Sequence, residues 1–465
     1  MYDQGTEEFD LVIVGAGPAG MSAAIAARAA GLSCVVLDEQ AAPGGQIYRN
    51  VESNWMGDRS ILGQEYYTGE SLVQDFRACG ATYLEGATVW ELTGDLRVAY
   101  SRNDAIGFAK GRALVVATGA LERPMTIPGW TLPGVMSVGS AQIMLKSEAA
   151  VPEGRFALAG TGPLLLLTAL QLCRTGAKPA AIIETGSQNK TGAFLSDPLA
   201  SAFGWQNLTK GLSWMRALRR HKVPHFHSAS DIIAQGDDRL TSVSFRHRHG
   251  TEQLKLDRLF LHQGVVPHLN LPASIECGLE WSDEKRLWRP RTGPEGQSDR
   301  EGVFIVGDGA EVLGAEAARI SGRLAALEII HQLTGQDTAR ERQVCRRQLD
   351  TERRFRRALD RAYLPPRDHL VPVSDDTIVC RCEAVTAGDL RQAAHQGCPG
   401  INQVKFFTRA GMGPCQARSC GTSVSLLMAQ ATGRSPTEVG YMSIRPPVKP
   451  VPLQQLASLA EEASR

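Results

Sequence analysis

The sequence predicts an α/β protein with two dinucleotide-binding units and a small C-terminal domain, and three observations lead to this fold class. A glycine-rich turn stands between an apolar strand and a helix within residues 9–30. A similar strand, turn and helix recur within residues 155–184. Four cysteines then fall in two close pairs near the C-terminus. The chain has 465 residues, about three times the usual domain length, and therefore has room for all three units.

Composition and charge exclude several classes of protein. Apolar residues make up 43% of the chain and charged residues 21%, which is typical of a globular protein with a sizeable core. The 50 lysines and arginines nearly balance 49 acidic residues, so no excess of positive charge is available to bind nucleic acid. The first ten residues carry four acids and no basic region, unlike a secretory signal. The longest apolar stretch, residues 158–173, is interrupted by glycine, proline and glutamine, so we expect no membrane span.

The first unit has the elements of a nucleotide-binding motif in the expected order. Residues 9–14 predict a buried strand, the G-x-G-x-x-G pattern of residues 15–20 follows at once, and the alanine-rich residues 22–30 predict a helix. Residues 34–37 predict a second strand, which ends at Asp38. Because strand, turn, helix and acid are all in register, we interpret this segment as a nucleotide site rather than a structural turn.

Each residue type in this motif has a physical reason. Gly15 permits the tight turn, and Gly17 lets backbone amides approach a pyrophosphate. Gly20 lets the helix pack closely against the strand, and the helix N-terminus stabilises the phosphate charge. The carboxylate of Asp38 can accept the hydroxyls of an adenosine ribose.

Three later segments complete the predicted site. The loop at residues 43–46 is flexible enough to lie against a flat ring system, and Thr118 and Gly119 follow another buried strand. Gly307 and Asp308 end a further strand before a helix predicted over residues 315–333, so the Gly307 amide can hold a phosphate and Asp308 a ribityl hydroxyl. The residues predicted to contact the cofactor are Gly15, Gly17, Pro18, Ala19, Gly20, Asp38, Glu39, Gly45, Gln46, Thr118, Gly119, Gly307 and Asp308.

The second glycine-rich turn departs from the pattern. A strand at residues 155–159 leads into Gly160 and Gly162, and a further strand ends near Glu184. Leu165 stands where the third glycine is expected, and its side chain either forces the helix away from the strand or fills the volume beside the turn. Two interpretations stay open at this point, a working nicotinamide site and a merely structural repeat.

Two further features have mainly structural interpretations. Residues 337–363 predict a charged helix with an apolar stripe of Phe355, Leu359 and Tyr363, which we interpret as a connecting helix on the body of the protein. A docking surface or a contact to a flavin phosphate is the alternative. The histidine pairs at residues 225/227 and 247/249 have the i, i+2 spacing of one strand face. No cysteine or carboxylate clusters with them in the sequence, so we interpret them as exposed strand faces rather than metal sites.

The cysteine pattern predicts a metal centre. Cys380 and Cys382 are separated by 32 residues from the second pair, Cys415 and Cys420. Four thiolates in two pairs suit a [2Fe–2S] cluster, which takes two sulfurs on each iron. A zinc site is the competing use, but the single residue within the first pair would strain one tetrahedral ion. The glycine-rich loop at residues 411–413 offers amides to the sulfurs, and we therefore favour iron–sulfur over zinc.

These features predict the domain boundaries. We expect a nucleotide-binding domain in two parts, residues 1–125 and 256–336, with a NAD-like domain inserted at residues 126–255. A charged helical linker at residues 337–372, a [2Fe–2S] domain at residues 373–445 and a tail at residues 446–465 follow.

The motifs resemble a known family. The first glycine turn, Asp38, the Gly44–Gln46 loop, Thr118-Gly119 and Gly307-Asp308 are similar to the two-dinucleotide-domain flavoproteins of the glutathione and thioredoxin reductase type. No C-x-x-C or C-x-x-x-x-C stands outside the C-terminal region, so disulfide reduction is not expected. With the four cysteines added, residues 8–460 resemble the α (A) subunit of heteromeric amino-acid dehydrogenases. This group includes opine oxidase, hydroxyproline and proline dehydrogenases, hydrogen cyanide synthase and, more remotely, the sarcosine oxidase α subunit.

The resemblance implies a division of labour. This chain would transfer electrons, while a separate β subunit would carry its own FAD and the amino acid, so no catalytic residue is assigned here. The resemblance also implies a [2Fe–2S] cluster in a ferredoxin-like domain, an FMN at a subunit interface and a small γ subunit. The nucleotide site would hold FAD, or ATP or NAD as in some relatives. The location implied is cytoplasmic, with peripheral membrane association through the complex. The alternatives are a free-standing NAD(P)H-dependent flavin/iron–sulfur reductase and a zinc-bound interaction module.

Overall fold

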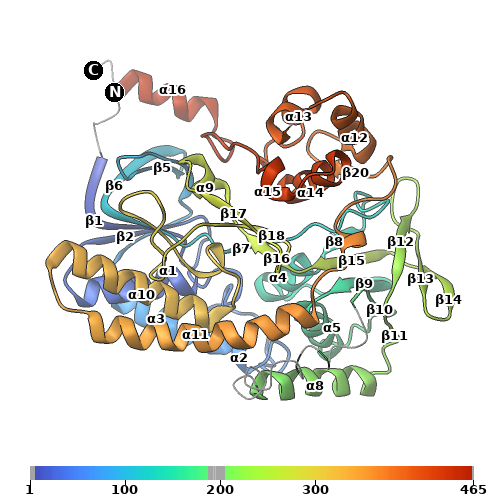
Figure 1. The fold of residues 1–465 in the computed structure, drawn as a ribbon. Helices are drawn as coiled ribbons and strands as arrows, with labels where there is room; N and C mark the ends of the chain where they lie inside the picture. Colours follow the sequence, from blue (N-terminus) through green and yellow to red (C-terminus); the bar gives the residue numbers. More distant parts are fainter. Residues whose placement is uncertain (1–5, 187–191, 193, 195–204, 399, 463–465) are drawn as a thin grey trace.

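The computed structural model describes residues 6–186, 192, 194, 205–398 and 400–462. The chain forms two α/β units and a smaller, mostly helical C-terminal domain (Figure 1). The acidic N-terminal stretch begins with residues 1–5, which lie outside the described residues. Within the described part, no helix is both long enough and apolar enough to cross a bilayer.

The first unit is built on a seven-stranded sheet with the order β3-β2-β1-β6-β5-β4, in which β19 also pairs with β6. The β1–β2, β2–β3, β1–β6 and β6–β19 pairs are parallel, and β4, β5 and β6 form an antiparallel meander. The strands are β1 (Thr6–Val14), β2 (Cys34–Asp38), β3 (Thr82–Glu85), β4 (Thr88–Leu92), β5 (Arg97–Arg102), β6 (Ala105–Val116) and β19 (Val303–Ile305).

Helices cover one face of this sheet. Alternate residues of a strand point to opposite sides, so the two faces of the sheet pack against different partners. Leu11 and Ile13 pack into the core shared with the helices, whereas Val12 and Val14 pack into a core shared with the C-terminal domain. Gly322 lets the helix Ala315–Thr334 approach the helix Pro18–Ala29 closely, since a Cβ at this position would lie 2.0 Å from the Ala19 carbonyl oxygen. The helices are α1 (Pro18–Ala29), α2 (Gln64–Tyr67), α3 (Gly69–Ala78), α10 (Ala315–Thr334) and α11 (Ala339–Ala362).

The second unit has a five-stranded parallel sheet, in the order β11-β10-β9-β15-β8, and a separate antiparallel sheet of three strands. The parallel strands are β8 (Val135–Ser137), β9 (Phe156–Thr161), β10 (Ala181–Glu184), β11 (His225–Phe226) and β15 (Arg258–Gln263). The antiparallel strands are β12 (Ser230–Gln235), β13 (Ser242–His247) and β14 (Gly250–Lys255). The helices are α4 (Val138–Glu148), α5 (Pro163–Arg174) and α8 (Trp205–Arg220).

One predicted boundary moves. The sequence pattern predicts that the chain returns to the first unit at residue 256, but β15 pairs with β9 and belongs to the second sheet. The crossing between the units is the antiparallel pair of β7 (Ala120–Glu122) and β16 (Val265–Pro267). A buried apolar strand has the same sequence pattern whichever sheet it joins, and this is why the predicted boundary lies too early.

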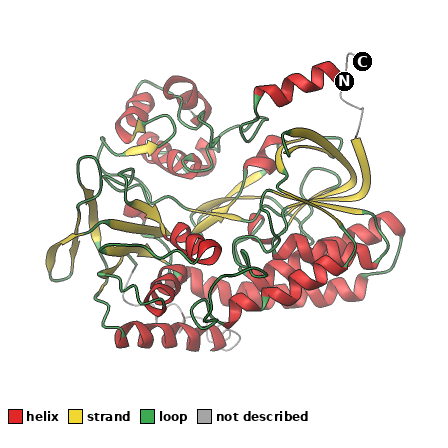
Figure 2. Cartoon of the chain, turned by 180° about the vertical axis from the view of Figure 1, so that it is seen from behind, coloured by secondary structure: helices red, strands yellow, loops and turns green. Residues whose placement is uncertain are grey.

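The C-terminal domain lies beside both units, as Figure 2 shows from behind, and contacts them through side chains. Trp130 of the second unit donates its indole N–H to the Ile378 carbonyl oxygen at 2.6 Å, and Trp288 donates to Ser425 Oγ at 3.1 Å. The domain contains β20 (Ile378–Cys380), β21 (Val385–Thr386), α12 (Ala387–His395), α13 (Ile401–Thr408), α14 (Gly421–Thr432) and α15 (Pro436–Val439). The remaining elements are α9 (Asn270–Ser274), the hairpin β17 (Leu279–Ser282) and β18 (Leu287–Pro290), the 3₁₀ turns at Gly307–Gly309 and Arg367–His369, and α16 (Leu453–Glu462).

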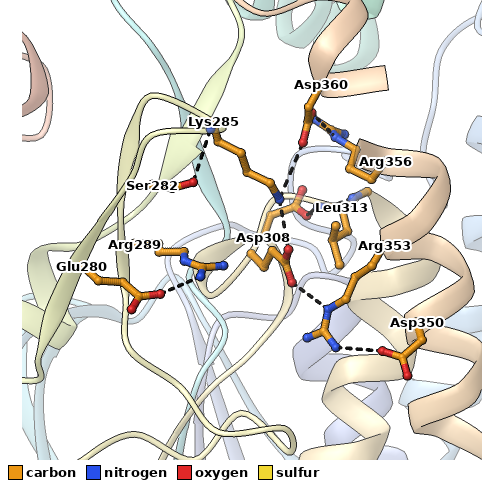
Figure 3. Close-up of polar contacts among 12 residues, drawn as sticks. Glu280, Ser282, Lys285, Arg289, Asp308, Leu313, Asp350, Arg353, Arg356 and Asp360 are labelled. Carbon is orange, nitrogen blue, oxygen red and sulfur yellow. Dashed lines mark hydrogen bonds and ion pairs between the residues drawn. The ribbon is translucent and has the colours of Figure 1, made fainter. Parts of the chain in front are cut away.

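The charged helix predicted over residues 337–363 is confirmed as α11, which lies along α10 (Figure 1). Ion pairs fix it to the hairpin and to the loop before α10, as Figure 3 shows. Glu311 accepts from Lys285 at 3.0 Å and from Arg353 at 2.9 Å, and Asp360 also pairs with Lys285. The predicted stripe of Phe355, Leu359 and Tyr363 is only partly buried. The side chains of α11 that are fully buried are Cys345, Leu349, Ala358 and Ala362.

Candidate functional site

The turn between β1 and α1 is built as the motif requires. Gly15 has φ +107°, and a Cβ there would lie 2.5 Å from the Ala117 carbonyl oxygen. A Cβ on Gly20 would lie 1.9 Å from the Gly15 carbonyl oxygen, so any side chain would push α1 away from β1. Gly17 is the N-cap of α1 and Pro18 its first residue, which leaves the first amides of the helix facing the turn. The geometry suits an anionic group at this helix N-terminus.

Asp38 and Glu39 divide the role that the motif predicts for an acid at the tip of β2. Asp38 is buried, and its two oxygens accept the amides of Ala16 at 2.5 Å and Gln40 at 2.7 Å. Burial raises the pKa of this carboxyl, although both amides act in the opposite direction. Asp38 thus ties the glycine turn to β2. Glu39 is half-exposed and pairs with Lys449 from the C-terminal tail, so it is the acid more open to a ligand.

The loop at residues 43–46 lies directly on the glycine turn. The Gly44 amide donates to the Ala16 carbonyl at 2.9 Å, and a Cβ on Gly45 would lie 2.9 Å from Gly17 Cα. The buried Lys146 side chain of α4 holds the end of this loop, because its ammonium donates to the carbonyls of Gln46 and Ile47, both at 3.0 Å. Burial lowers the pKa of Lys146 to about 7. A single lysine in a helix carries no motif, so no signal in the sequence pointed to it.

The turn that begins at Gly307-Asp308 approaches Thr118-Gly119 closely, since a Cβ on Gly309 would lie 3.3 Å from the Gly119 carbonyl oxygen. The Gly307 amide, predicted to hold a phosphate, already donates to Ser321 Oγ at 2.8 Å. Asp308 Oδ1 accepts the amides of Leu313 and Gly314 at 2.9 and 3.0 Å and thereby shapes the entry to α10 (Figure 3). The two residues therefore order the loop before α10.

The second glycine turn is filled by side chains of the protein. Leu165 is completely buried in the core of the second unit. A Cβ on Gly162 would lie 2.8 Å from His262 Nε2, so the imidazole occupies the space beside the turn. That ring is itself fixed, because its Nδ1 lies 2.5 Å from Glu122 Oε1. This arrangement favours the structural interpretation of the second turn.

The end of β10 corrects the interpretation of the first histidine pair. Glu184 Oε2 lies 3.2 Å from His225 Nε2 and 3.1 Å from His227 Nδ1. The sequence pattern placed no carboxylate near these histidines. Because β10 and β11 are parallel neighbours, with Ile182 opposite His225, the fold places the Glu184 carboxylate beside the two histidines, although it lies about forty residues earlier in the chain. Tyr363 also lies close enough for its pKa to be raised to about 12, by burial first and then by the Glu184 charge.

The four predicted ligand cysteines come together at one end of the C-terminal domain. The thiol of Cys380 contacts that of Cys420, and the thiol of Cys382 contacts that of Cys415. The contact with Cys420, together with backbone amides including that of Gly411, lowers the pKa of Cys380 to about 6. Its partner Cys420 has a raised pKa because of this contact and burial. Each pair thus joins one cysteine from the β20 side and one from the glycine-rich loop, a pairing that sequence spacing did not reveal.

The spacing of the sulfurs fits a site for two metal ions better than a site for one. A single tetrahedral zinc with Zn–S bonds of about 2.3 Å would bring all four sulfurs to about 3.8 Å from one another. Among the described residues, no three of these sulfurs lie within 4.8 Å of one another. Two separate pairs instead suit a binuclear centre with two sulfurs on each metal. The loop approaches closely, since a Cβ on Gly413 would lie 2.4 Å from Cys382 Cβ.

Three consecutive residues, 268–270, join the first unit to the loop of residues 411–420, which carries Cys415 and Cys420 and is called the cysteine loop below. The His268 amide donates to the Gly119 carbonyl at 3.0 Å, and Asn270 Nδ2 donates to the carbonyl of Gln416, next to Cys415, at 2.7 Å. Both side chains are buried. Burial, and then the nearby Arg418 charge, lowers the pKa of His268 to about 4, so its imidazole is neutral at pH 7. These residues follow β16 without any motif, so no signal in the sequence pointed to them.

Comparison with known proteins agrees with this architecture. The model of the pyridine nucleotide-disulphide oxidoreductase family matches residues 9–324. The chain belongs to this family. The family assigns it to the FAD-binding oxidoreductases, and the predicted two-dinucleotide-domain fold is confirmed. A second model, the sarcosine oxidase A3 domain, matches residues 375–460, which contain the four paired cysteines.

Relatives within this oxidoreductase family confirm the predicted resemblance. The A subunit of opine oxidase from Agrobacterium tumefaciens (strain Ach5) is 39% identical, with 98% of this chain and 92% of the relative covered. The HcnB subunit of hydrogen cyanide synthase from Pseudomonas aeruginosa is 34% identical over 97% of this chain and 99% of its own. The crystal structure of L-proline dehydrogenase from P. horikoshii has the same fold, with a TM-score of 0.70, 18% identity, and 98% of this chain and 81% of that chain covered.

Proposed function

We propose that this chain is the electron-transferring α subunit of a heteromeric flavin/iron–sulfur dehydrogenase. The observation that carries the proposal is the physical link between the two candidate cofactor sites. Residues 268–270 bond the Gly119 loop of the first unit on one side and the cysteine loop on the other. A rigid, buried link of this kind fixes the distance between two redox groups, which electron transfer between them requires.

The relatives support both the role within a complex and the substrate class. The opine oxidase relative and HcnB are named as subunits of larger enzymes. We infer that the substrate is an amino acid or secondary amine of the opine, hydroxyproline, proline or glycine type, oxidised at a CH–NH or CH–NH₂ group. The substrate would be held by a β subunit carrying its own FAD. An FMN at the interface and a small ferredoxin-like γ subunit would complete the assembly.

The residues present fit both cofactors. The amides at the start of α1 would hold the FAD pyrophosphate, and Glu39 would take the ribose hydroxyls because Asp38 is bonded to the turn. Cys380 and Cys420 would bind one iron of a [2Fe–2S] cluster, and Cys382 and Cys415 the other. When bound, the flavin exchanges two electrons and the cluster one at a time. The chain's own part is to hold both groups, exclude water and offer amides such as that of Gly411 to the sulfurs.

The test is a metal and nucleotide analysis of protein purified without oxygen, together with the polypeptides that co-purify with it. We expect about two irons and two acid-labile sulfides per chain, one bound flavin or adenine nucleotide, and an electron paramagnetic resonance signal after reduction. Cys382→Ser and Cys415→Ser should remove most of the iron and leave the nucleotide bound. Cys398→Ala changes a buried cysteine of the same domain and serves as the matched control. Zinc without sulfide in the native protein would instead support the interaction module.

The alternative of a free-standing NAD(P)H-dependent reductase receives less support. Leu165 and the His262 ring fill the second turn, and Glu184 is engaged by two histidines. Stopped-flow mixing of the flavin-loaded chain with NADH or NADPH should therefore leave the flavin absorbance unchanged. Rapid bleaching would establish the reductase and contradict the proposed role of the second unit.

A further inference from the structure

Glu184, His225 and His227 form a cluster of three metal-ligand side chains in the second unit, away from both candidate cofactor sites. Their ligand atoms all lie within 4.8 Å of one another. The Glu184 side chain is 1% exposed, whereas those of His225 and His227 are 22% and 37% exposed. The carboxylate therefore forms the floor of the cluster and the two imidazoles form an opening that water and ions can reach.

The distances match those around a bound ion. A tetrahedral ion with nitrogen and oxygen ligands at about 2.0–2.1 Å places neighbouring ligand atoms about 3.3 Å apart. The observed separations from Glu184 Oε2 are 3.2 Å to His225 Nε2 and 3.1 Å to His227 Nδ1. The two rings lie side by side, with centroids 4.0 Å apart and planes inclined by 34°. Little rearrangement is thus needed to admit an ion among the three atoms.

The backbone explains why the cluster is so compact. His225 and His227 alternate with Phe226, so both imidazoles stand on one side of the extended segment that begins with β11. Phe226 points to the other side, where its ring centroid lies 5.0 Å from that of Phe245. The parallel pairing of β10 with β11 places Glu184 beside them. A buried carboxylate is costly unless it gains donors or positive charge, and both imidazoles approach the same oxygen. A divalent ion would supply that charge directly.

From this geometry we propose that Glu184 Oε2, His225 Nε2 and His227 Nδ1 bind a divalent transition-metal ion. Two imidazoles and one carboxylate favour Zn²⁺ and its neighbours Co²⁺ and Ni²⁺ over Mg²⁺ or Ca²⁺, which take mainly oxygen ligands. Three protein ligands leave a fourth position for water. The proposal is independent of the electron-transfer function.

The site also has a consequence for nucleotide binding. Glu184 ends the second strand of its unit, as Asp38 does in the first, and this is the position from which an acid accepts ribose hydroxyls. A carboxylate oxygen that binds a metal ion is no longer available to a ribose. The second unit would thus hold an ion at the place where a two-domain reductase holds nicotinamide dinucleotide.

The experiment uses the full chain with its iron–sulfur site loaded without oxygen, so that the four cysteines are occupied. Calorimetric titration with Zn²⁺ should show one equivalent bound, and Co²⁺ should give a tetrahedral visible spectrum without the charge-transfer band of a thiolate ligand. In the double variant H225A/H227A the affinity for Zn²⁺ should fall by more than about 100-fold. Removing a residue that only bonds to a metal ligand costs about 10–100-fold, and this variant removes two ligands. E184Q keeps the size of the side chain and should also weaken binding strongly, which guards against misfolding of the double variant.

The matched control is the double variant H247A/H249A. This pair has the same i, i+2 spacing and lies in the same unit, and its nearest acid, Glu252, is 3.9 Å from His247. Zinc binding should be unchanged in this variant. The proposal is overturned if the unaltered chain binds no Zn²⁺ or Co²⁺ once the cysteines are occupied. It is equally overturned if H225A/H227A and E184Q bind as tightly as the unaltered chain.

Discussion

The two strand–turn–helix units share one topology but use the ends of their strands differently. In the first, Gly20 lets α1 approach β1 and the space beside the turn is bounded by backbone, since the nearest atom to a Cβ on Gly17 is Gly45 Cα at 3.8 Å. In the second, Leu165 is buried in the core and the His262 ring lies beside Gly162. The first unit can admit a nucleotide at its turn, whereas the second has filled the same place with its own side chains.

The acids at the ends of the second strands show the same divergence. Asp38 bonds only backbone amides, so the neighbouring Glu39 is left to face a ligand. Glu184 is held by two imidazoles from the next strand. A repeated fold therefore does not carry a repeated function, because function depends on which polar groups at the strand ends stay exposed to a ligand and which are buried against partners inside the chain.

The largest effect on nucleotide content is expected from closing the first turn. In Gly20→Ala the new Cβ would lie 1.9 Å from the Gly15 carbonyl oxygen, and α1 must move away from the pyrophosphate position. Bound nucleotide should fall by at least about tenfold, or about 1.4 kcal/mol. The measurement is flavin or nucleotide released per purified chain. Gly57→Ala, where no atom lies within 4 Å of the new Cβ, should retain full content. An unchanged content in Gly20→Ala would remove the distinction between the two turns.

Emptying the second turn should leave nucleotide content unchanged and lower only the stability of the second unit. Leu165→Ala should leave a cavity in the core of the second unit and lower its free energy of unfolding by about 3 kcal/mol. Because we assign no nucleotide to this turn, flavin content and iron content should not change. The loss of unfolding free energy is measured by urea unfolding, with hydrogen exchange in β9 and β10 as the probe of the second unit. Leu164→Ala, at a partly exposed neighbouring position, is the control and should cost much less. Loss of a bound nucleotide in Leu165→Ala would contradict the structural interpretation.

A smaller loss of stability, which appears only at low pH, is expected at the link between the first unit and the cysteine loop. The pKa of His268 is lowered to about 4 in the folded chain, below its usual value of 6.5, because burial disfavours the charged imidazole. The unfolded chain therefore binds the extra proton between pH 6.5 and pH 4, and stability is lost as the pH falls through this range. The contribution of this group is at most about 1.4 kcal/mol per pH unit.

Thermal unfolding at pH 7 and pH 5 tests this sign. His268→Gln removes the titrating group and should reduce the drop in midpoint between the two pH values. His249→Gln, at an exposed position of the second unit, should behave like the unaltered chain. Equal acid sensitivity in His268→Gln and the unaltered chain would show that the link is not buried as the structure has it.

Much of the architecture followed from local patterns. The strand, the glycine turn and the helix after it depend on neighbours in the chain. The strand predicted over residues 9–14 lies within β1 (Thr6–Val14), and the helix predicted over residues 22–30 is α1 (Pro18–Ala29). The helix over residues 315–333 and the charged α11 were also predicted closely, since both segments are long and rich in alanine, leucine, glutamate and arginine, which favour helix. The assignment of residues 258–263 to the first unit failed because strand pairing is decided by distant partners.

The candidate sites were predictable only where a residue type implies its chemistry. Four cysteines in two pairs indicate a metal centre in any sequence, but the pairing of Cys380 with Cys420 required the fold. Lys146 and Asn270 carry no signal in the sequence, since each acts through contacts with residues about one hundred or more positions away. For the same reason the sequence showed no carboxylate beside His225 and His227, because Glu184 lies about forty positions earlier in the chain.

By itself the sequence determined the elements and the chemical inventory of this protein. It set two glycine turns, two acids at strand ends, two histidine pairs and four thiols, because each of these depends on residue type and short spacing. Only the tertiary structure decided which of these groups meet. Asp38 accepts hydrogen bonds from backbone amides, and Glu184 lies within hydrogen-bond distance of two imidazoles. Residues 268–270 bond both the Gly119 loop and the cysteine loop. The physical reason is that a buried polar group takes the partner that the packed chain brings to it, and that partner is set by the topology rather than by its distance along the chain.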